Sequence, residues 1–436
     1  MSDTHKKDGA AATGRHRIID TTYLSLTGQD LWGDLNSDLD TLSLRERSNI
    51  VELDRELHSH WELGRNFLLG WCAHGDGMQL LIVPHYTVAD YALGSVTEPP
   101  GSTSRDEAAN FVMGMLSRKR QLNPRQMETA SRLMGVAPTL IALRQALTGS
   151  PAETRVIEKL VTRYGVRYVQ NRAVALFDIV GFSLLSPFEQ MTQLNSLSYS
   201  LNSAHSKMLD KKVNVRFARS STGDGFYIWN RDLGVSANTN LYHLMHLVLA
   251  DNAIARRKAH NRTVPLLRTA FHVGSCYEFH QAEGLNPTVF SDIVGDVTID
   301  LARMVDRALP GQVLVGDFQA ALPGDSPDTR VELDSVSFID FAQHNLSQLN
   351  GLVLSGEAIQ SIKCYLTGEA SGDGQFSIRK LSIEDKHGLS HLVFNAKINI
   401  YRDHAEPILL GIEDRILRGD HLDMSTFCHI LPELSH

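Results

Sequence analysis

A short apolar run that ends in a carboxylate constrains the fold of this chain more than any other segment. Residues 172–183, Arg-Ala-Val-Ala-Leu-Phe-Asp-Ile-Val-Gly-Phe-Ser, contain an apolar stretch long enough for a buried strand but too short for a typical helix. Asp178 therefore lies at the end of a predicted strand. A second carboxylate, Asp224, lies in a Thr-Gly-Asp-Gly-Phe segment with apolar residues on its C-terminal side. That pattern predicts a hairpin with an acidic tip.

If the strand and the hairpin are neighbours in one sheet, Asp178 and Asp224 come together at its edge. With the backbone carbonyl of Ile179, they form a set of hard oxygen donors suited to Mg²⁺ or Mn²⁺. A pair of such ions can hold a nucleoside triphosphate and activate a hydroxyl for in-line attack on phosphorus. The two segments therefore predict a metal-dependent phosphoryl-transfer site.

The length and composition of the chain exclude several other classes of protein. With 436 residues, the chain is long enough for two or three domains. A net charge of -8 argues against binding to nucleic acid or to an anionic membrane, because both require a basic face. The four cysteines are scattered without a CxxC pair, which favours reduced thiols. Without an apolar run of roughly 18–20 residues or a signal-peptide core, we expect a cytoplasmic protein with no membrane insertion.

Four motifs, in this order, resemble the catalytic domain of class III nucleotide cyclases, the adenylate and guanylate cyclase superfamily. They are Phe-Asp-Ile-Val-Gly-Phe-Ser at 177–183, Gly-Asp-Gly at 223–225, Asp-Ile-Val-Gly at 292–295 with Leu-Ala-Arg at 301–303, and Pro-Gly-Gln-Val-Leu-Val at 310–315. The resemblance covers roughly residues 171–317, about a third of the chain. It implies an α+β fold with a ferredoxin-like palm, two Mn²⁺ or Mg²⁺ ions per site, and a homodimer with composite active sites.

The resemblance also implies roles for single residues. Asp178, Ile179 and Asp224 would hold the metal ions, and the two aspartates would be catalytic. Arg303 falls at the position of the transition-state arginine, which in this superfamily reaches into the partner's site. The predicted substrate contacts are Phe177, Phe182, Arg219, Ser220, Asp292 and Ile299.

The chain departs from the purine cyclases at two of these positions. Four residues before the second metal aspartate, purine cyclases have a lysine or a glutamate, and this chain has Ser220 beside Arg219. The family's transition-state asparagine falls on Ile299, or on Asp300 if the alignment slips by one residue. Arg219 or Ser220 would then donate a hydrogen bond to a pyrimidine carbonyl. Phe182 either lines this pocket or belongs to the core.

The C-terminal segment 383–400 resembles the sensor-like domain attached to pyrimidine cyclases of bacterial antiphage systems of the Pycsar type. The resemblance implies conversion of UTP to 3′,5′-cyclic UMP and pyrophosphate, with the product acting on a separate effector protein. The alternatives are a cytidylate cyclase that uses CTP, an adenylate cyclase with an atypical pocket, and an inactive nucleotide-binding module. For the C-terminal segment, a β-rich domain that only covers the sheet remains equally open.

The expected organisation has four parts. They are a disordered tail at 1–17, a mainly helical region at 18–165, a cyclase catalytic domain at 166–320 and a β-rich sensor-like domain at 321–436. In the N-terminal region, helices are predicted at 42–69, 105–117, 124–147 and 151–164. In the catalytic domain, helices are predicted at 187–209, 238–260 and 296–307, and strands at 214–219 and 266–279. Two further Gly-Asp-Gly segments, at 75–77 and 372–374, are predicted to be plain hairpin turns.

Overall fold

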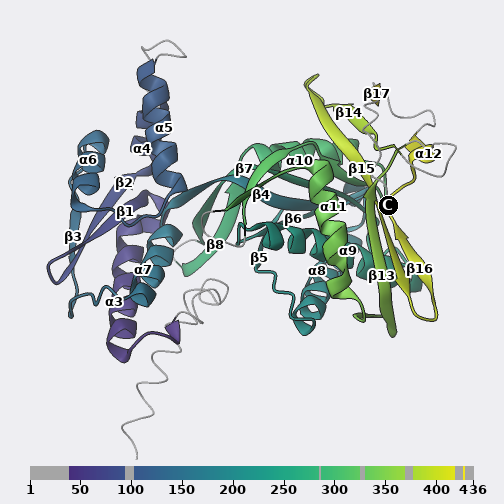
Figure 1. Ribbon diagram of the computed structural model, residues 1–436, viewed down its shortest axis with the longest axis horizontal. Helices are drawn as coiled ribbons and strands as arrows, with labels where there is room; N and C mark the ends of the chain where they lie inside the picture. The colour runs from purple at the N-terminus through teal and green to yellow at the C-terminus, as the bar shows by residue number, and fades with distance from the viewer. Residues whose placement is uncertain are drawn as a thin grey trace, which may run out of the picture. The chain divides into compact units, whose positions relative to one another are not determined.

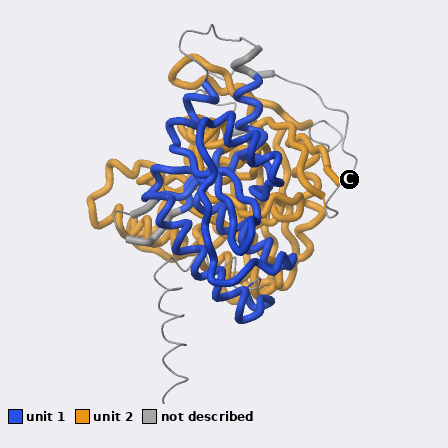
Figure 2. The backbone as a smooth tube through the Cα atoms, turned by 90° about the vertical axis from the view of Figure 1, so that its left-hand side faces the viewer, with its two compact units in different colours: residues 1–168, 277–292 blue, residues 169–276, 293–436 orange. Residues whose placement is uncertain are grey.

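The computed structural model describes residues 39–93, 103–283, 286–324, 329–368, 377–417 and 426–427. The predicted tail at 1–17, the Gly-Asp-Gly segment at 372–374 and Cys428 lie outside these ranges. The chain forms two compact units (Figure 2). Unit 1 comprises residues 1–168 and 277–292, and unit 2 comprises residues 169–276 and 293–436. Among the described helices, none combines the length and the apolar character needed to cross a bilayer.

Unit 1 is built on an antiparallel sheet with the strand order β1-β2-β3. The strands are β1 (Asn66–His74), β2 (Gly77–Pro84) and β3 (Thr139–Ala142). The helices are α3 (Leu44–Trp61), the 3-10 turn η1 (Glu62–Gly64), α4 (His85–Leu93), α5 (Thr103–Ser117), α6 (Pro124–Met134) and α7 (Pro151–Arg163). The Gly-Asp-Gly segment at 75–77 closes the hairpin between β1 and β2, as predicted.

Consecutive residues of the unit 1 strands enter two different hydrophobic cores. Leu68 and Leu80 pack with residues of α3 and α7. Their neighbours Leu69 and Leu81 pack with residues of α4, α5 and α6. Because side chains alternate between the faces of a strand, a strand that is apolar at nearly every position can hold helices on both faces.

The N-terminal region is largely helical, as expected, but its sheet was not predicted. The helix expected at 42–69 ends at Trp61, where Glu62 adopts a left-handed conformation with φ 48°, and β1 follows. The helix expected at 124–147 ends at Gly135, with φ 65°, and β3 follows. The prediction was wrong at β1 because a strand buried at nearly every position has no polar alternation that separates it from a buried helix. It was wrong at β3 because a strand of four residues, of which only Ile141 is buried, is too short to show a period of its own.

Unit 2 has an α+β fold around one long mixed sheet (Figure 1). Its strand order is β12-β13-β15-β9-β7-β4-β6-β5, with β8 paired to β7, β14 and β16 paired to β15, and β17 paired to β14. The strands of this sheet are β4 (Val166–Ile179), β5 (Phe217–Ser221), β6 (Gly225–Asn230), β7 (Leu267–Glu283), β8 (Asn286–Val294), β9 (Val313–Gly316), β12 (Val353–Leu354), β13 (Glu357–Leu366), β14 (Lys380–Glu384), β15 (Ser390–Arg402), β16 (Ala405–Leu410) and β17 (Thr426–Phe427). The first residues of β4, the last residues of β7 and most of β8 belong to unit 1. A separate ribbon pairs β10 (Gln319–Pro323) with β11 (Arg330–Asp334).

The helices of unit 2 include the three predicted at 187–209, 238–260 and 296–307, each to within three residues, together with others that were not predicted. The described helices are η2 (Phe182–Leu184), α8 (Pro187–Asp210), α9 (Val235–Lys258), α10 (Asp296–Arg307), α11 (Ser335–Asn345), η3 (Leu346–Leu349) and α12 (Asp414–Leu417). The elements of the palm follow one another along the chain in the order strand β4, helix α8, hairpin β5–β6, helix α9 and strand β7. Their strand order in the sheet, β7-β4-β6-β5, is that of a ferredoxin-like palm. This confirms the predicted α+β class.

The C-terminal strands continue the palm sheet. β15 is antiparallel to β9, with Phe394 opposite Val315, and β9 is parallel to β7. The boundary predicted between residues 320 and 321 is therefore crossed by a ladder of backbone hydrogen bonds. Residues 169–276 and 293–436 form one compact unit, so the strands expected in a separate domain are part of the sheet that carries the palm.

The palm sheet has a hydrophobic core on each face. Phe177, Ile228 and Phe271 pack with residues of α8, α9 and α11. Leu176 and Trp229 pack with residues of α10 on the other face. Because faces alternate along each strand, the register decides which side chains share the face of α10 and which share the face of α8 and α9.

Two histidines of α9, His243 and His246, are fully buried in the first of these cores. The Nε2 atom of His243 lies 3.0 Å from the carbonyl oxygen of Ala342. Neither ring nitrogen of His246 has a hydrogen-bond partner among the described residues. Burial lowers the pKa of His243 to about 4 and the pKa of His246 well below its usual value. Both rings are therefore neutral in the folded protein at neutral pH.

We expect the free energy of unfolding to decrease as the pH falls from about 6.5 to about 4. Over this interval the unfolded chain binds protons at these histidines and the folded chain does not, which costs about 2 kcal/mol at pH 5 for His243 alone. Thermal unfolding at several pH values measures the slope. The slope should be smaller in His246→Leu and unchanged in His344→Gln, whose side chain is exposed. An unchanged slope in His246→Leu would contradict this account.

Candidate active site

The strand end and the acidic hairpin meet as the sequence predicted. The backbone amide of Ile179 donates a hydrogen bond to the backbone carbonyl of Asp224 at 3.0 Å. In the antiparallel pairing of β4 with β6, Asp178 is opposite Gly225. The main chain therefore holds both carboxylate-bearing residues at one point of the palm.

The hairpin requires glycine on both sides of Asp224. Gly223 has φ +95°, a conformation that residues with a Cβ atom rarely adopt. At Gly225, a Cβ atom would lie 1.9 Å from the carbonyl oxygen of Phe177. This close approach of β6 to β4 is what brings the hairpin tip beside the end of the strand.

Asp178 is buried and paired with an arginine that the sequence analysis did not single out. Its carboxylate accepts a hydrogen bond from Nε of Arg268, at the start of β7, at 2.5 Å. Burial raises the pKa of Asp178; the ion pair with Arg268 opposes this shift, and the charges of Asp224 and Asp306 add to it. Asp306, on α10, was also not predicted. The available signal for Arg268 was a single arginine in the apolar run 264–271.

Ser220 lies on the same face of the sheet as Asp178. In the strand register Ser220 is opposite Tyr227, and Tyr227 is opposite Leu176. Since residues two apart share a face, Asp178 follows Leu176 on this face. The hydroxyl of Tyr227 donates to the backbone carbonyl of Thr298 on α10 at 3.0 Å, and burial raises its pKa to about 12.

Arg219 lies on the opposite face. It is paired with Ile228, which belongs to the core under α8 and α9. Its Nη1 donates to the hydroxyl of Ser198 on α8 at 2.9 Å, and its guanidinium carbon lies 5.3 Å from the centroid of the Phe226 ring. The two residues predicted to read the base therefore do not share a face of the sheet.

The two predicted phenylalanines both contribute to the core. Phe177 is 1% exposed and packs in the core under α8 and α9. Phe182, in η2, is partly buried against the same core. For Phe182, this is one of the two roles that the sequence left open.

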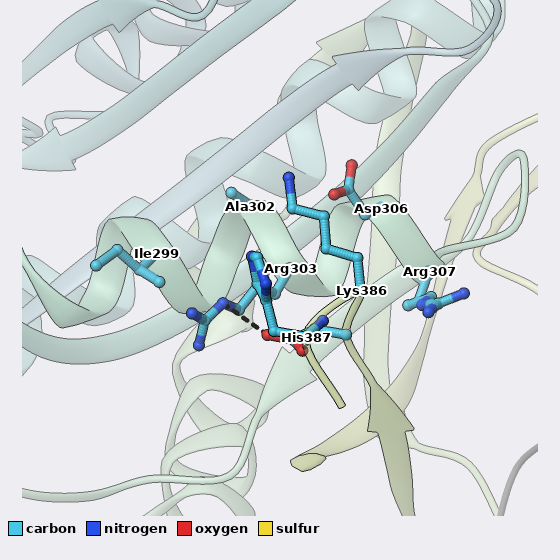
Figure 3. Close-up of a pocket in the computed structure, with 8 residues that line it drawn as sticks. Ile299, Ala302, Arg303, Asp306, Arg307, Lys386 and His387 are labelled. Atoms are coloured by element: carbon cyan, nitrogen blue, oxygen red, sulfur yellow. Dashed lines mark hydrogen bonds and ion pairs between the residues drawn. The ribbon is translucent and has the colours of Figure 1, made fainter. Parts of the chain in front are cut away.

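Arg303 projects from α10 at a cleft of about 470 Å³ (Figure 3). The cleft is lined by Ile299, Ala302, Arg303, Asp306, Arg307, Asp385, Lys386 and His387. Nε of Arg303 forms an ion pair with Oδ2 of Asp385 at 3.0 Å, shown by the dashed line in Figure 3. Lys386 and His387, which the sequence analysis did not assign to the site, add basic groups to this cleft.

Asp385 is held rigidly in the turn between β14 and β15. Its Oδ1 accepts the backbone N–H groups of His387 at 2.8 Å and of Leu389 at 2.9 Å. The hydrogen bond from Leu389 is the largest cause of a pKa lowered to about 2 for Asp385, and the bond from His387 adds to this shift. The carboxylate therefore stays ionised and fixes the position of Arg303.

The remaining predicted residues have different surroundings. Ile299 is 46% exposed at the cleft. Asp300, the alternative at this position, lies 3.6 Å from Nε2 of His272 and 3.4 Å from Nδ1 of His391. Asp292, near the end of β8, belongs to unit 1, whereas the other predicted site residues belong to unit 2.

The donors at the end of β4 fit a hard divalent cation. They are the carboxylate oxygens of Asp178 and Asp224 and the backbone carbonyl of Ile179. Within the described ranges, no group of three or more His, Cys, Asp or Glu side chains gathers at metal-binding distances. Two carboxylates completed by a carbonyl, water and substrate phosphates are nonetheless a set that suits Mg²⁺.

No protein-family model matches the sequence, and no curated protein matches it. Parts of the chain are similar in structure to solved cyclase domains. The guanylate cyclase domain of RhGC from Catenaria anguillulae, in complex with GTP, is 11% identical, covers 54% of this chain and 98% of its own, and has a TM-score of 0.31. The adenylyl cyclase CyaB from P. aeruginosa is 12% identical, covers 53% of this chain and 95% of its own, and has a TM-score of 0.29. At these TM-scores, the functional assignment rests on the site residues.

We expect Gly225→Ala to destabilise the protein by about 2 kcal/mol, because the new Cβ forces β6 away from the Phe177 carbonyl. Separation of β4 from the hairpin should also abolish Mn²⁺ binding, measured by calorimetry beside a thermal unfolding curve. Gly114→Ala is the matched control, since a Cβ at this position of α5 meets nothing within 4 Å. Wild-type Mn²⁺ affinity in Gly225→Ala would show that the close approach does not build the site.

Proposed function

We propose that this chain is a metal-dependent nucleotide cyclase of the class III type. The proposal rests on the backbone hydrogen bond from Ile179 to Asp224, which holds the end of β4, where Asp178 lies, against the acidic hairpin of a ferredoxin-like palm. Asp178, Asp224 and the Ile179 carbonyl would hold two divalent ions, Mn²⁺ or Mg²⁺. When bound, these ions supply activation of the ribose 3′-hydroxyl and neutralisation of the pyrophosphate leaving group.

The reaction is an in-line displacement at the α-phosphorus of a nucleoside triphosphate. The ribose 3′-oxygen forms a bond to this phosphorus, the bond to the α,β-bridging oxygen breaks, and the hydroxyl proton passes to water. The products are a 3′,5′-cyclic nucleotide and pyrophosphate. Arg268 balances the charge of Asp178 in the free protein, and Arg303 would stabilise the charge on the transferring phosphoryl group.

For the substrate we propose UTP, with CTP as the second candidate. Ser220 takes the place of the purine-reading lysine or glutamate, and it shares a sheet face with Asp178. A short hydroxyl side chain leaves room in the pocket and can donate to a pyrimidine carbonyl. Arg219 is a weaker candidate for base contact, because it is bound to Ser198 on the other face. The cyclic UMP product would act as a second messenger on a separate effector protein in antiphage defence.

Incubation with ATP, GTP, CTP and UTP in Mn²⁺, followed by mass spectrometry, identifies the substrate. We expect cyclic UMP, and we expect Asp224→Asn to lower kcat by at least about a hundredfold, since it removes a charged metal ligand. Asp76→Asn is the matched control, because Asp76 is the central residue of the Gly-Asp-Gly turn between β1 and β2 and should have wild-type activity. Cyclic AMP as the main product would refute the assignment of a pyrimidine substrate but would agree with the proposed cyclisation reaction. No cyclic product from any nucleotide, together with metal-dependent UTP binding, would favour an inactive binding module.

We propose in addition that the enzyme is a homodimer with composite sites. Phe188, Met191 and Tyr199, which are 69%, 53% and 68% exposed, lie on one side of α8 at helical spacing, and Leu184 of η2, 89% exposed, precedes them. Such a stripe is typical of a protein–protein interface. A second copy of the chain would cover it and would bring Arg303 of one protomer to the metal carboxylates of the other.

Composite sites predict complementation between two inactive variants. Asp224→Asn and Arg303→Ala should each be inactive alone, and together they should recover about a quarter of the wild-type activity. Half of randomly assembled dimers are mixed, and each mixed dimer has one intact site of two. Asp178→Asn with Asp224→Asn is the control and should recover nothing, because both changes affect the same half of the site. If a mixture of Asp224→Asn and Arg303→Ala remains inactive although mixed dimers form, composite sites are excluded.

A further inference from the structure

A second cleft, of about 330 Å³, lies on the face of β7 opposite Asp178. It is formed by the last turns of α9, the start of β7, the entry to β9 and the end of β16. Its apolar lining includes Leu249, Leu266 and Leu410. Leu267 and Thr269 of β7 point to this cleft, whereas Arg268 between them points to the other face and pairs with Asp178.

Two buried polar residues that line this cleft have atoms without a partner. Asn252 is 5% exposed; its Nδ2 donates to the carbonyl oxygen of Pro265 at 3.0 Å, but its Oδ1 has no hydrogen-bond partner among the described residues. Thr269 is fully buried, and its hydroxyl likewise has none. Because an unpaired buried polar group costs about 1–3 kcal/mol, two at one cleft point to a ligand that forms hydrogen bonds there.

The charged residues that line the cleft are both basic. Arg256 and Arg257, in the last turn of α9, line it, are exposed and form no ion pair with any described residue. No aspartate or glutamate is among the described residues that line it. This charge distribution favours an anion.

We propose that this cleft binds a small organic phosphate. The phosphate group would pair with Arg256 and Arg257, whose guanidinium groups suit bidentate contacts with phosphate oxygens. The apolar or planar body would lie against Leu249 and Leu266, and an N–H or O–H group would donate to Oδ1 of Asn252. A nucleoside monophosphate combines these features, and the imide N–H of uridine 5′-monophosphate makes this compound a suitable probe.

If the proposed cyclase function holds, the cleft regulates it. The backbone amide of Val180, directly after the metal strand, donates to the carbonyl of Leu266 at 2.9 Å. A ligand against Leu266 and Thr269 therefore contacts the neighbour of Arg268 and the residue whose carbonyl binds Val180, two residues after Asp178. Since Arg268 competes with a metal ion for the Asp178 carboxylate, occupancy of the cleft changes the metal affinity of the active site.

Calorimetric titration of the full-length protein with uridine 5′-monophosphate and with inorganic phosphate tests the proposal. EDTA in the buffer removes divalent ions and so prevents metal-dependent nucleotide binding at Asp178 and Asp224. We expect saturable binding of the nucleotide with one site per chain, and binding of inorganic phosphate at least about tenfold weaker because it has no apolar body. Arg257→Glu should weaken nucleotide binding by at least about tenfold.

Two control variants make the test specific. Lys258→Glu makes the same change of charge at the same helix end, but Lys258 does not line the cleft and donates to Ser355, so binding should stay within about twofold of wild type. Asp224→Asn should also bind as wild type. The proposal is overturned by no binding of the nucleotide, by equal affinity for inorganic phosphate, by equal loss in Lys258→Glu and Arg257→Glu, or by loss in Asp224→Asn. Each of these outcomes is measured without turnover, so it is independent of whether any nucleotide is cyclised.

Discussion

The site of this protein depends on the close approach of two backbones, β4 and the start of β6. Gly225 allows β6 to lie against the Phe177 carbonyl, where any Cβ atom would clash. The hydrogen bond from Ile179 to Asp224 then fixes the hairpin tip beside the strand end. Because both contacts are made by main-chain atoms, strand pairing itself places the backbones of Asp178 and Asp224 beside each other.

The alternation of side chains along the palm strands assigns neighbouring residues to different tasks. Ser220 shares the face of Asp178, and Arg219, one residue earlier, is held on the face of α8. In the same way, Arg268 pairs with Asp178 while Thr269 lines the cleft near α9. One strand, β7, thereby connects the candidate active site on one face to a basic cleft on the other.

The turn between β14 and β15 contributes to the candidate site although it is distant in the sequence. Asp385, ionised through its backbone hydrogen bonds, holds Arg303, and Lys386 and His387 complete the lining of the cleft. This arrangement is possible because β15 pairs with β9 and so continues the palm sheet. The C-terminal segment is thus part of the architecture around the arginine that we propose for catalysis.

The sequence by itself determined the palm and its carboxylates, because these depend on local signals: an apolar strand that ends at Asp178, and glycines that permit a tight turn around Asp224. It also located α8, α9 and α10 to within a few residues, since each is a long segment free of glycine and of internal proline. Only the tertiary structure decided that Arg268 pairs with Asp178 and that the side chains of Arg219 and Ser220 lie on opposite faces of the sheet. It also decided which strands extend the sheet beyond the palm. Those facts depend on register and long-range strand pairing, and composition and periodicity contain no record of either.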